Sequence, residues 1–508
     1  MLRALTVSIV VTLALSSPAR ADDWVEIRTE GFTVYGDDGE KAARKVAARL
    51  EALRGFLQSE WAWARFAPDL PVVVVALEEE KQFQLLLPAS FARSRTRLGG
   101  LTLFEGHRTL VLLHGEVPED PAEDNPHHAV YHEYVHTVLG RTLRLPTWLS
   151  EGLAEYWGST KIKEREIEFG RPIAGHIFTL RTKAWFPLET LFRVEPSSGV
   201  YNEGDRSSVF YAESWALVHY LALGSLERRG QLNRLVTLIA RGRDEIDASH
   251  EILGDLDVLL KEVRAYAGRR SLPFRKRLRG PIEEAARGSA RRLSRAEVLA
   301  LRGGVLLSGR RPGEGRALVE EALKLDPGLV AAKEAMGIAA SVAGDRETAQ
   351  AWLMRADESG RAGFFTHYLL GLLAAAEKSP QASVRGEAQL REAIRLNPQF
   401  APAPTMLAGL LAERGGSRVE ALQLVDQATK LDQSSALVRL GVAHALWRLG
   451  ELELAKAYAR AAVRLAPNPS FGSMAAEVLR FIETGQAPRS DKPPLPVLPI
   501  PETPAPKP

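Results

Sequence analysis

The sequence predicts an α+β domain with a small, mostly antiparallel sheet, followed by an all-α superhelix of stacked helix pairs. Three observations lead to this fold class. Strand-like segments gather near the start, helical periodicity dominates from about residue 122 to 266, and a short motif recurs at intervals of 34 to 35 residues further on. The 508 residues also exceed the usual size of one hydrophobic core, so we expect two or more domains.

The first residues, "MLRALTVSIVVTLALSSPARADD", have the pattern of a secretory signal peptide over residues 1–21. Arg3 precedes an apolar run, and Ala19-Arg20-Ala21 is a small-x-small cleavage pattern. The apolar run of 12 residues falls short of the roughly 20 that cross a bilayer, which disfavours a retained anchor. We therefore expect a protein exported to the periplasm or the exterior of a bacterium, without a transmembrane segment in the mature chain.

The composition is that of an ordinary globular protein, with 45% hydrophobic and 25% charged residues. A formal net charge of +3 gives no reason to expect nucleic acid as a partner. The chain has no cysteine. Any metal site must therefore be built from histidine and carboxylate side chains.

The early segments alternate between strands and helices. "WVEIRTEGFTVYG" (24–36) alternates like a strand, and "EKAARKVAARLEALRGFLQ" after it has helical spacing. "PVVVVAL" (71–77) is a β-branched run. "GLTLFEGHRTLVLLH" (100–114) predicts a hairpin that turns near Glu105-Gly106.

The segment "YHEYVHTVLG" holds the strongest chemical signal. His132 and His136 are four residues apart, so on a helix both imidazoles project from one face and can meet one metal ion. Glu133 points beside the ion, where a base for a metal-bound water belongs. Asn125 and Pro126 predict the start of this helix and Gly140 its end.

A second helix, "PTWLSEGLAEYWG", follows a loop of about seven residues that is long enough to make the two helices antiparallel. Glu151 is then level with His136, and Glu155 is level with His132. We expect Glu151 as the third metal ligand and Glu155 as the carboxylate that orients His132 through its other ring nitrogen. A glycine such as Gly152 destabilises a helix by about 1 kcal/mol relative to alanine. We therefore expect that close packing against another helix requires a glycine at this point.

Together, "HEYVH" and "LPTWLSEGLAEYW" resemble the gluzincin zinc metallopeptidases, above all the bacterial peptidase MA-like group. The resemblance implies a zincin-like fold and one Zn²⁺. The membrane alanyl aminopeptidases share the second motif. By motif Glu151 is the ligand, whereas by spacing Glu155, with 18 residues between it and His136, matches those aminopeptidases. The motif and the level helices favour Glu151. His128 shares the face of His132 but falls in the first turn, and we do not expect it to be a ligand.

The resemblance extends to "FYAESWALVHYL" (210–221), which is similar to the aminopeptidase segment whose tyrosine binds the developing oxyanion. It implies that role for Tyr211; the alternative is an aromatic residue that merely starts an amphipathic helix. The Gly-x-Met-Glu-Asn loop that captures a substrate amino terminus is absent, which favours an endopeptidase. The resemblance also implies that the strand near 101–104 binds an extended peptide by strand addition.

Beyond residue 291 a motif repeats four times, as "ALKLDP", "AIRLNP", "ATKLDQ" and "AVRLAP". Each unit is predicted to hold two short amphipathic helices, the second ending where proline cannot continue it. The pattern resembles the tetratricopeptide repeat. A degenerate unit ending near Glu358 gives about five units in all. Such pairs stack into a superhelix, and the resemblance implies a protein partner on its concave face.

The domains predicted from these patterns are the signal peptide (1–21), a gluzincin-like peptidase domain (22–268), a basic linker (269–290), a tetratricopeptide domain (291–484) and a proline-rich disordered tail (485–508). The expected function is an exported zinc metallopeptidase whose repeats recruit a substrate or partner. The alternative is an inactive zincin domain joined to a tetratricopeptide scaffold of the cell envelope.

Overall fold

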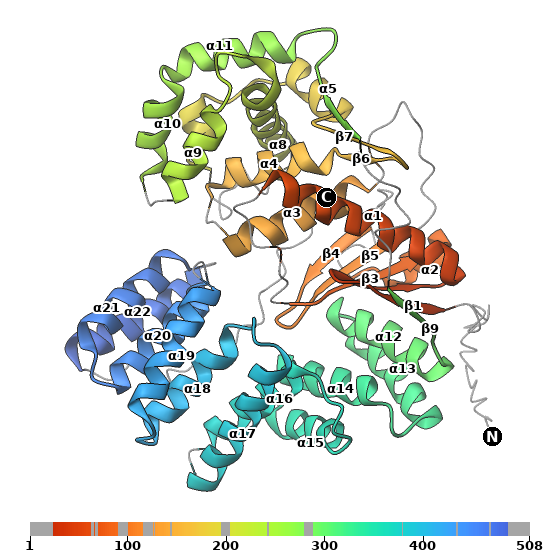
Figure 1. Cartoon of the computed structure of the whole chain (residues 1–508), viewed down its shortest axis with the longest axis vertical. Coiled ribbons are helices and arrows are strands. Elements are labelled where there is room, and N and C mark those ends of the chain that lie inside the picture. Colours follow the sequence, from red (N-terminus) through yellow and green to blue (C-terminus); the bar gives the residue numbers. More distant parts are fainter. Residues whose placement is uncertain are drawn as a thin grey trace, which may run out of the picture.

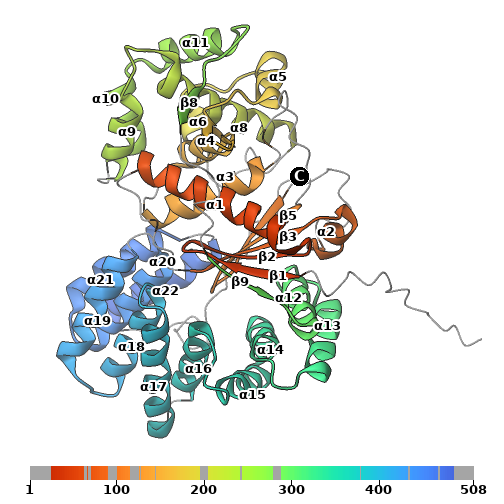
Figure 2. The same cartoon turned by 45° about the vertical axis from the view of Figure 1, so that its right-hand side comes forward.

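The computed structural model describes residues 24–61, 66, 70–89, 100–114, 125, 127–142, 145–194, 204–240, 243–278, 288–377, 379–432, 435–466 and 469–485. The predicted signal peptide and the tail beyond residue 485 lie outside the described residues. Figure 1 shows two parts: the sheet domain, which comprises the described residues from 24 to 292, and the repeat array, which is the set of helices that follows. The array curves along one side of the sheet domain, and Figure 2 shows the same arrangement from another side.

A six-stranded sheet lies at the centre of the sheet domain, in the order β4-β5-β3-β2-β1-β9. The two inner pairings of β3, with β2 and with β5, are parallel, while the three outer pairings are antiparallel. The predicted strand at 24–36 forms two strands, β1 and β2, and the predicted hairpin forms β4 and β5. The strands are Val25–Arg28 (β1), Phe32–Gly36 (β2), Val72–Leu77 (β3), Gly100–Phe104 (β4), Thr109–His114 (β5) and Ser289–Arg292 (β9).

Both faces of this sheet are buried, which explains the continuous β-branched run in β3. Val72 and Val74 point into a core with α1 (Gly39–Glu60) and α3 (His128–Thr142). Val73 and Val75 point into a second core with α2 (Glu80–Leu86) and α12 (Arg295–Ser308). Since α12 is the first helix of the repeat array, the array shares a hydrophobic core with the sheet.

The rest of the sheet domain is mainly helical, with a small second sheet in the order β6-β7-β8. Helix α4 packs against both α3 and α8. A single π-helical turn, Tyr220–Gly224, continues α8. The elements are α4 (Thr147–Gly158), β6 (Lys161–Ile162), β7 (Glu166–Phe169), α5 (Ala174–Thr182), α6 (Leu188–Phe192), α8 (Gly204–His219), α9 (Gln231–Ala240), α10 (Glu245–Leu253), α11 (Leu256–Ala267) and β8 (Arg275–Leu278).

The basic segment 269–290, interpreted from the sequence as a linker, contributes strands to both sheets. In β8, which pairs with β7, Lys276 Nζ lies 2.9 Å from Glu168 and 3.4 Å from Glu166. β9 pairs with β1 and leads directly into α12, whose first turn carries a capping box between Ser294 and Glu297. Ion pairs with buried or half-buried glutamates therefore help to hold β8 in the second sheet.

Among the described residues after 292, the repeat array has five helix pairs and a final helix, which matches the expected count of about five units. The degenerate unit near Glu358 is the pair α14 and α15. The helices after α12 are α13 (Pro312–Leu325), α14 (Val330–Val342), α15 (Arg346–Asp357), α16 (Phe364–Ala376), α17 (Pro380–Leu396), α18 (Pro402–Glu413), α19 (Arg418–Leu431), α20 (Ala436–Arg448), α21 (Leu452–Arg464) and α22 (Pro469–Thr484). Among the described residues, none of the helices has both the length and the apolarity that a membrane span requires.

Candidate metal centre

Helices α3 and α4 carry the predicted metal ligands and pack side by side. The Asn125 side chain accepts a hydrogen bond from the backbone N–H of His127 at 3.0 Å, near the predicted helix start. It also donates to the carbonyl oxygens of Gly158 and Thr160, at the end of α4 and just beyond it. Asn125 thus ties the start of α3 to the end of α4. Pro126 is outside the described residues, and α3 runs two residues beyond the predicted end at Gly140.

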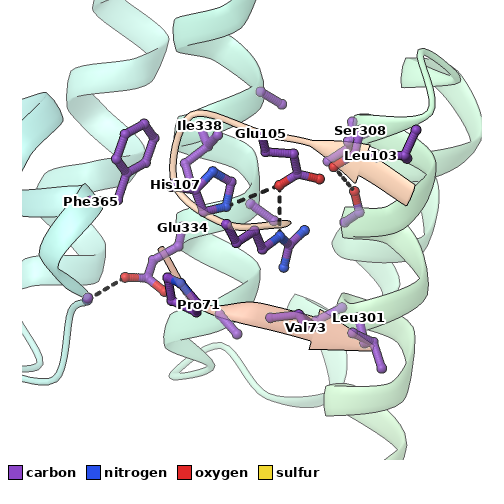
Figure 3. Close-up of a pocket in the computed structure, with 18 of the residues that line it drawn as sticks. Pro71, Val73, Leu103, Glu105, His107, Leu301, Ser308, Glu334, Ile338 and Phe365 are labelled. Carbon is purple, nitrogen blue, oxygen red and sulfur yellow. Dashed lines mark hydrogen bonds and ion pairs between the residues drawn. The ribbon is translucent and has the colours of Figure 1, made fainter. Parts of the chain in front are cut away.

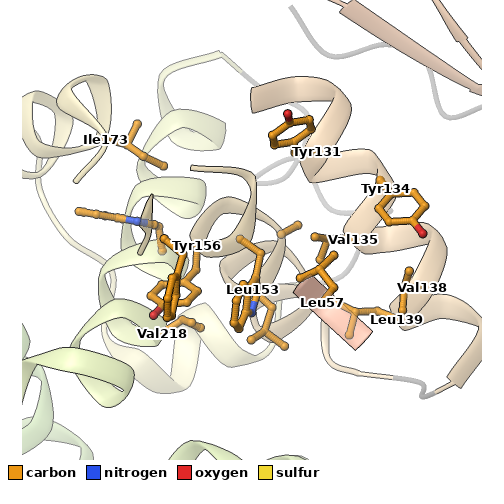
Figure 4. Close-up of a cluster of buried hydrophobic side chains, with 14 of the residues drawn as sticks. Leu57, Tyr131, Tyr134, Val135, Val138, Leu139, Leu153, Tyr156, Ile173 and Val218 are labelled. Atoms are coloured by element: carbon orange, nitrogen blue, oxygen red, sulfur yellow. The ribbon is translucent and has the colours of Figure 1, made fainter. Parts of the chain in front are cut away.

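Apolar side chains fix the two helices against each other and against α1. Figure 4 shows Val135 and Leu139 of α3 on the same side as Leu153 of α4, with Leu57 of α1 beside them. All four side chains are buried in one core. The adjacent stripe of α3, with His132 and His136, faces Glu151 and Glu155 of α4.

The side chains of His132, His136 and Glu151 meet at one point. Glu151 Oε2 is 3.2 Å from His132 Nε2 and 3.2 Å from His136 Nε2, and the two Nε2 atoms are 3.0 Å apart. The other ring nitrogen of His136, Nδ1, lies 3.1 Å from Ser150 Oγ. Both imidazoles therefore direct the same nitrogen toward the carboxylate.

Glu151 is only 5% exposed. Burial raises the pKa of its carboxyl, but the neighbouring His136 and His132 imidazoles outweigh that effect and hold the pKa well below its usual range. The side chain is thus an anion at neutral pH.

Glu155 forms the centre of a second cluster, one turn further along α4. Its Oε1 is 3.5 Å from His132 Nδ1, and its Oε2 is 3.1 Å from His128 Nε2 and 2.9 Å from His176 Nε2 on α5. Burial raises the pKa of Glu155, yet His176 and His128 hold it well below its usual range. His176 is a contact that sequence reasoning missed, because it lies on a separate helix with no motif around it.

The first cluster fits a zinc ion. Its two imidazole nitrogens and one carboxylate oxygen lie within 4.8 Å of one another, and two histidines with one glutamate are a donor set that catalytic zinc takes. His128, His132 and Glu155 form a second group within the same limit. In it Glu155 contacts the ring nitrogen of His132 that faces away from Glu151, as a carboxylate that orients a ligand does.

Two further predicted residues lie on neighbouring helices. Glu133, half-buried on α3, belongs to neither cluster of ligand atoms. Tyr211, also half-buried, lies on α8 and packs at the edge of the main core. The helix that carries Tyr211 approaches α4 closely, because Gly152 lies against the backbone of Ser214. The close helix packing expected at Gly152 is therefore present.

Comparison with known proteins bears on the repeat array. A sequence profile of the tetratricopeptide repeat matches residues 436–469, which include α20 and α21. The chain contains a tetratricopeptide repeat. Its helix pairs follow one another with the spacing of such repeats, and repeats of this kind indicate a scaffold for protein partners. No curated protein matches the chain significantly.

Several solved structures are similar to part of the chain, and two of them are described as tetratricopeptide proteins. YrrB, described as having an unusual peptide-binding site, shares 20% identity over 36% of this chain and 91% of its own, with a TM-score of 0.30. The pilF protein of Pseudomonas aeruginosa has 15% sequence identity over 37% of this chain and 84% of its own, with a TM-score of 0.31. A tetratricopeptide protein of Thermus thermophilus has 20% sequence identity over 36% of this chain and 99% of its own, with a TM-score of 0.30.

Proposed function

We propose that this chain is an exported zinc-dependent endopeptidase whose tetratricopeptide repeats recruit a protein substrate or partner. The observation that carries the proposal is the convergence of His132, His136 and Glu151 to within 3.2 Å of one another, on two antiparallel helices. In this proposal these three residues hold the ion. Glu155 orients His132 through its Nδ1 atom.

A bound zinc ion supplies a Lewis acid that polarises a peptide carbonyl and lowers the pKa of water. Glu133, next to His132 on α3, takes a proton from the attacking water and passes it to the leaving amine. Tyr211 donates a hydrogen bond to the oxygen that becomes negative in the transition state. An extended substrate pairs with the edge strand β4, which begins beside α3.

Metal analysis combined with peptide hydrolysis tests these roles. Glu133→Gln is expected to keep one zinc per chain and lose turnover, whereas Glu151→Ala is expected to lose the zinc. Tyr211→Phe should lower kcat by about 100-fold with little change in KM. Glu189→Gln, at an exposed glutamate of the same domain, is the matched control and should keep both zinc and activity. Full turnover in Glu133→Gln would exclude the mechanism.

The tetratricopeptide match supports a second candidate, a zinc-holding scaffold that binds proteins without cutting them. Cleavage of a peptide library, measured together with the capture of partners, distinguishes the two candidates. A zinc-loaded wild-type protein that leaves a broad peptide library intact, yet captures the same partners as Glu133→Gln, supports the scaffold. Partners that accumulate only on Glu133→Gln are substrates, and they support the peptidase.

A further inference from the structure

A pocket of about 650 Å³ lies where the repeat array meets the sheet domain. Figure 3 shows it between the tip of the β4–β5 hairpin and the helices of the array. The first helices of three successive pairs line it, with Leu301 on α12, Ile338 on α14 and Phe365 on α16. Leu103 and Val73 line it from the sheet. A cavity of this size and lining suits an apolar ligand of a few residues.

The polar groups at the hairpin tip are bound to one another. Glu105 Oε2 accepts a hydrogen bond from Arg108 Nε at 2.7 Å and lies 3.3 Å from His107 Nε2. Burial lowers the pKa of His107 to about 4, so its ring is neutral at neutral pH, and it stacks on Phe365 with 4.8 Å between ring centroids. The tip is thus a fixed wall of the pocket, and the surface it leaves for a ligand is mainly apolar.

Strand β4 connects this pocket to the candidate metal centre. At its first residue, Gly100, a side chain would clash with Val130, which lies two positions before His132 on α3. Its last residue, Phe104, lines the pocket. The strand is about 13 Å long from the first Cα to the last at ~3.3 Å per residue. β5 pairs with one side of β4, and within the described part of the chain no strand pairs with the other side.

We propose that this pocket binds apolar side chains of the substrate, at a fixed distance from the bond that is cut. The inference rests on the proposed peptidase function and adds a specificity site to it. A peptide that pairs antiparallel with β4 runs from Phe104 toward Gly100, so its amino-terminal part reaches the pocket. At ~3.3 Å per residue, the residues that enter are about four to six positions before the scissile bond.

Peptide binding to the Glu133→Gln variant tests the pocket without turnover. The probes are fluorescent decapeptides with one cleavage sequence, extended at the amino terminus with either Gly-Ser or Leu-Phe. Burial of two apolar side chains is expected to tighten binding about tenfold or more. Ala339→Trp, which fills the pocket, and Val342→Lys, which charges its rim, should each remove that gain. Val384→Lys, at an exposed valine on α17, is the matched control and should retain it.

The outcomes distinguish this inference from the proposed function. A gain that persists in both Ala339→Trp and Val342→Lys, or that appears only with carboxyl-terminal extensions, would overturn the pocket assignment. Equal affinity of the two probes for Glu133→Gln would overturn it as well. If wild-type protein cuts no probe while the gain still depends on Ala339, the peptidase is refuted and the pocket stands as a peptide-binding site. An unchanged thermal unfolding midpoint of Ala339→Trp, measured by circular dichroism, shows that this variant is folded.

Discussion

Gly152 of α4 lies directly against the backbone of Ser214 on α8. A Cβ placed on Gly152 would come within 2.9 Å of the carbonyl carbon of Ser214 and within 2.7 Å of a methyl group of Val218. Because of this contact the backbones of α4 and α8 touch at Gly152, and Glu151 is the residue directly before it. The position of the proposed ligand thus depends on the absence of a side chain next to it.

Gly152→Ala should therefore destabilise the protein by about 1–3 kcal/mol, because the added methyl group forces α4 away from α8. It should also weaken zinc binding, since Glu151 moves with the helix. Urea denaturation and a zinc titration measure the two effects. Gly55→Ala is the matched control, because Gly55 lies on α1 where an added methyl group would meet no neighbouring side chain or segment within 4 Å. That change should stabilise by about 0.5–1 kcal/mol, and equal effects at both sites would contradict the role of Gly152.

Glu155→Ala should lower zinc affinity by about 10- to 100-fold while one zinc still binds at saturation. The reason is that His132 loses the carboxylate at its Nδ1 atom but keeps its Nε2 atom directed at Glu151, where the ion would lie. Competition with a chromophoric chelator gives the affinity. The comparison with Glu151→Ala is decisive: if Glu155→Ala abolishes zinc binding and Glu151→Ala does not, Glu155 is the ligand, as the aminopeptidase spacing indicates.

Glu213→Gln should change the pH dependence of stability. Burial raises the pKa of Glu213 to about 8, against a backbone hydrogen bond from Phe186 that lowers it. An acid with a raised pKa binds more protons in the folded state than in the unfolded state, so it makes the free energy of unfolding fall as pH rises from about 4.5 to about 8. Glutamine remains neutral and removes that fall.

Urea denaturation at pH 5 and pH 9 measures this effect. The glutamine variant should resemble wild type at pH 5 and be more stable at pH 9, by an amount on the order of a few kcal/mol. Glu227→Gln, at an exposed glutamate, should show no such difference between the two pH values. If Glu213→Gln instead loses the same stability at pH 5 and at pH 9, the fold requires the carboxyl group itself, and its protonation does not set the pH dependence.

Val305→Ala tests the shared core between the sheet and the repeat array. Val305 of α12 is fully buried with Val73 and Val75 of β3. Removing two methyl groups there should cost about 1–3 kcal/mol. It should lower the unfolding midpoint of both parts together if they unfold as one unit, which fluorescence and circular dichroism can follow in parallel. Val419→Ala, at an exposed valine of α19, should change stability by less than about 0.5 kcal/mol.

Periodicity alone accounts for much of the arrangement at the candidate site. A spacing of four residues puts His132 and His136 on one face, and a short reversal brings Glu151 level with them; in the structure Glu151 Oε2 is equally distant from both Nε2 atoms. Local rules of this kind work because the residues concerned are close in sequence and sit on regular helices. That Glu151 binds zinc stays a prediction.

Contacts between distant segments could not be predicted in this way. His176 approaches Glu155 because α5 packs against α8, and nothing around His176 signals that packing. The basic stretch "GSARRLSR" has no strand periodicity, yet it forms β9 because β1 offers an unpaired edge and Glu26 pairs with Arg291. Charge patterning suggested a linker over 269–290, and its last two residues, Ser289 and Ala290, lie in β9 through tertiary pairing.

The pairing of β1 with β9 also sets the order in which the protein can fold. Val25 and Arg292 are register partners, so β1, the first strand among the described residues, pairs with one of the last segments of its domain. Until then the edge of β1 is open to other strands, and late pairing between distant segments slows folding. A chain in which residues 289–292 have not yet docked therefore carries an incomplete sheet, and a chaperone that covers β1 would protect it until then.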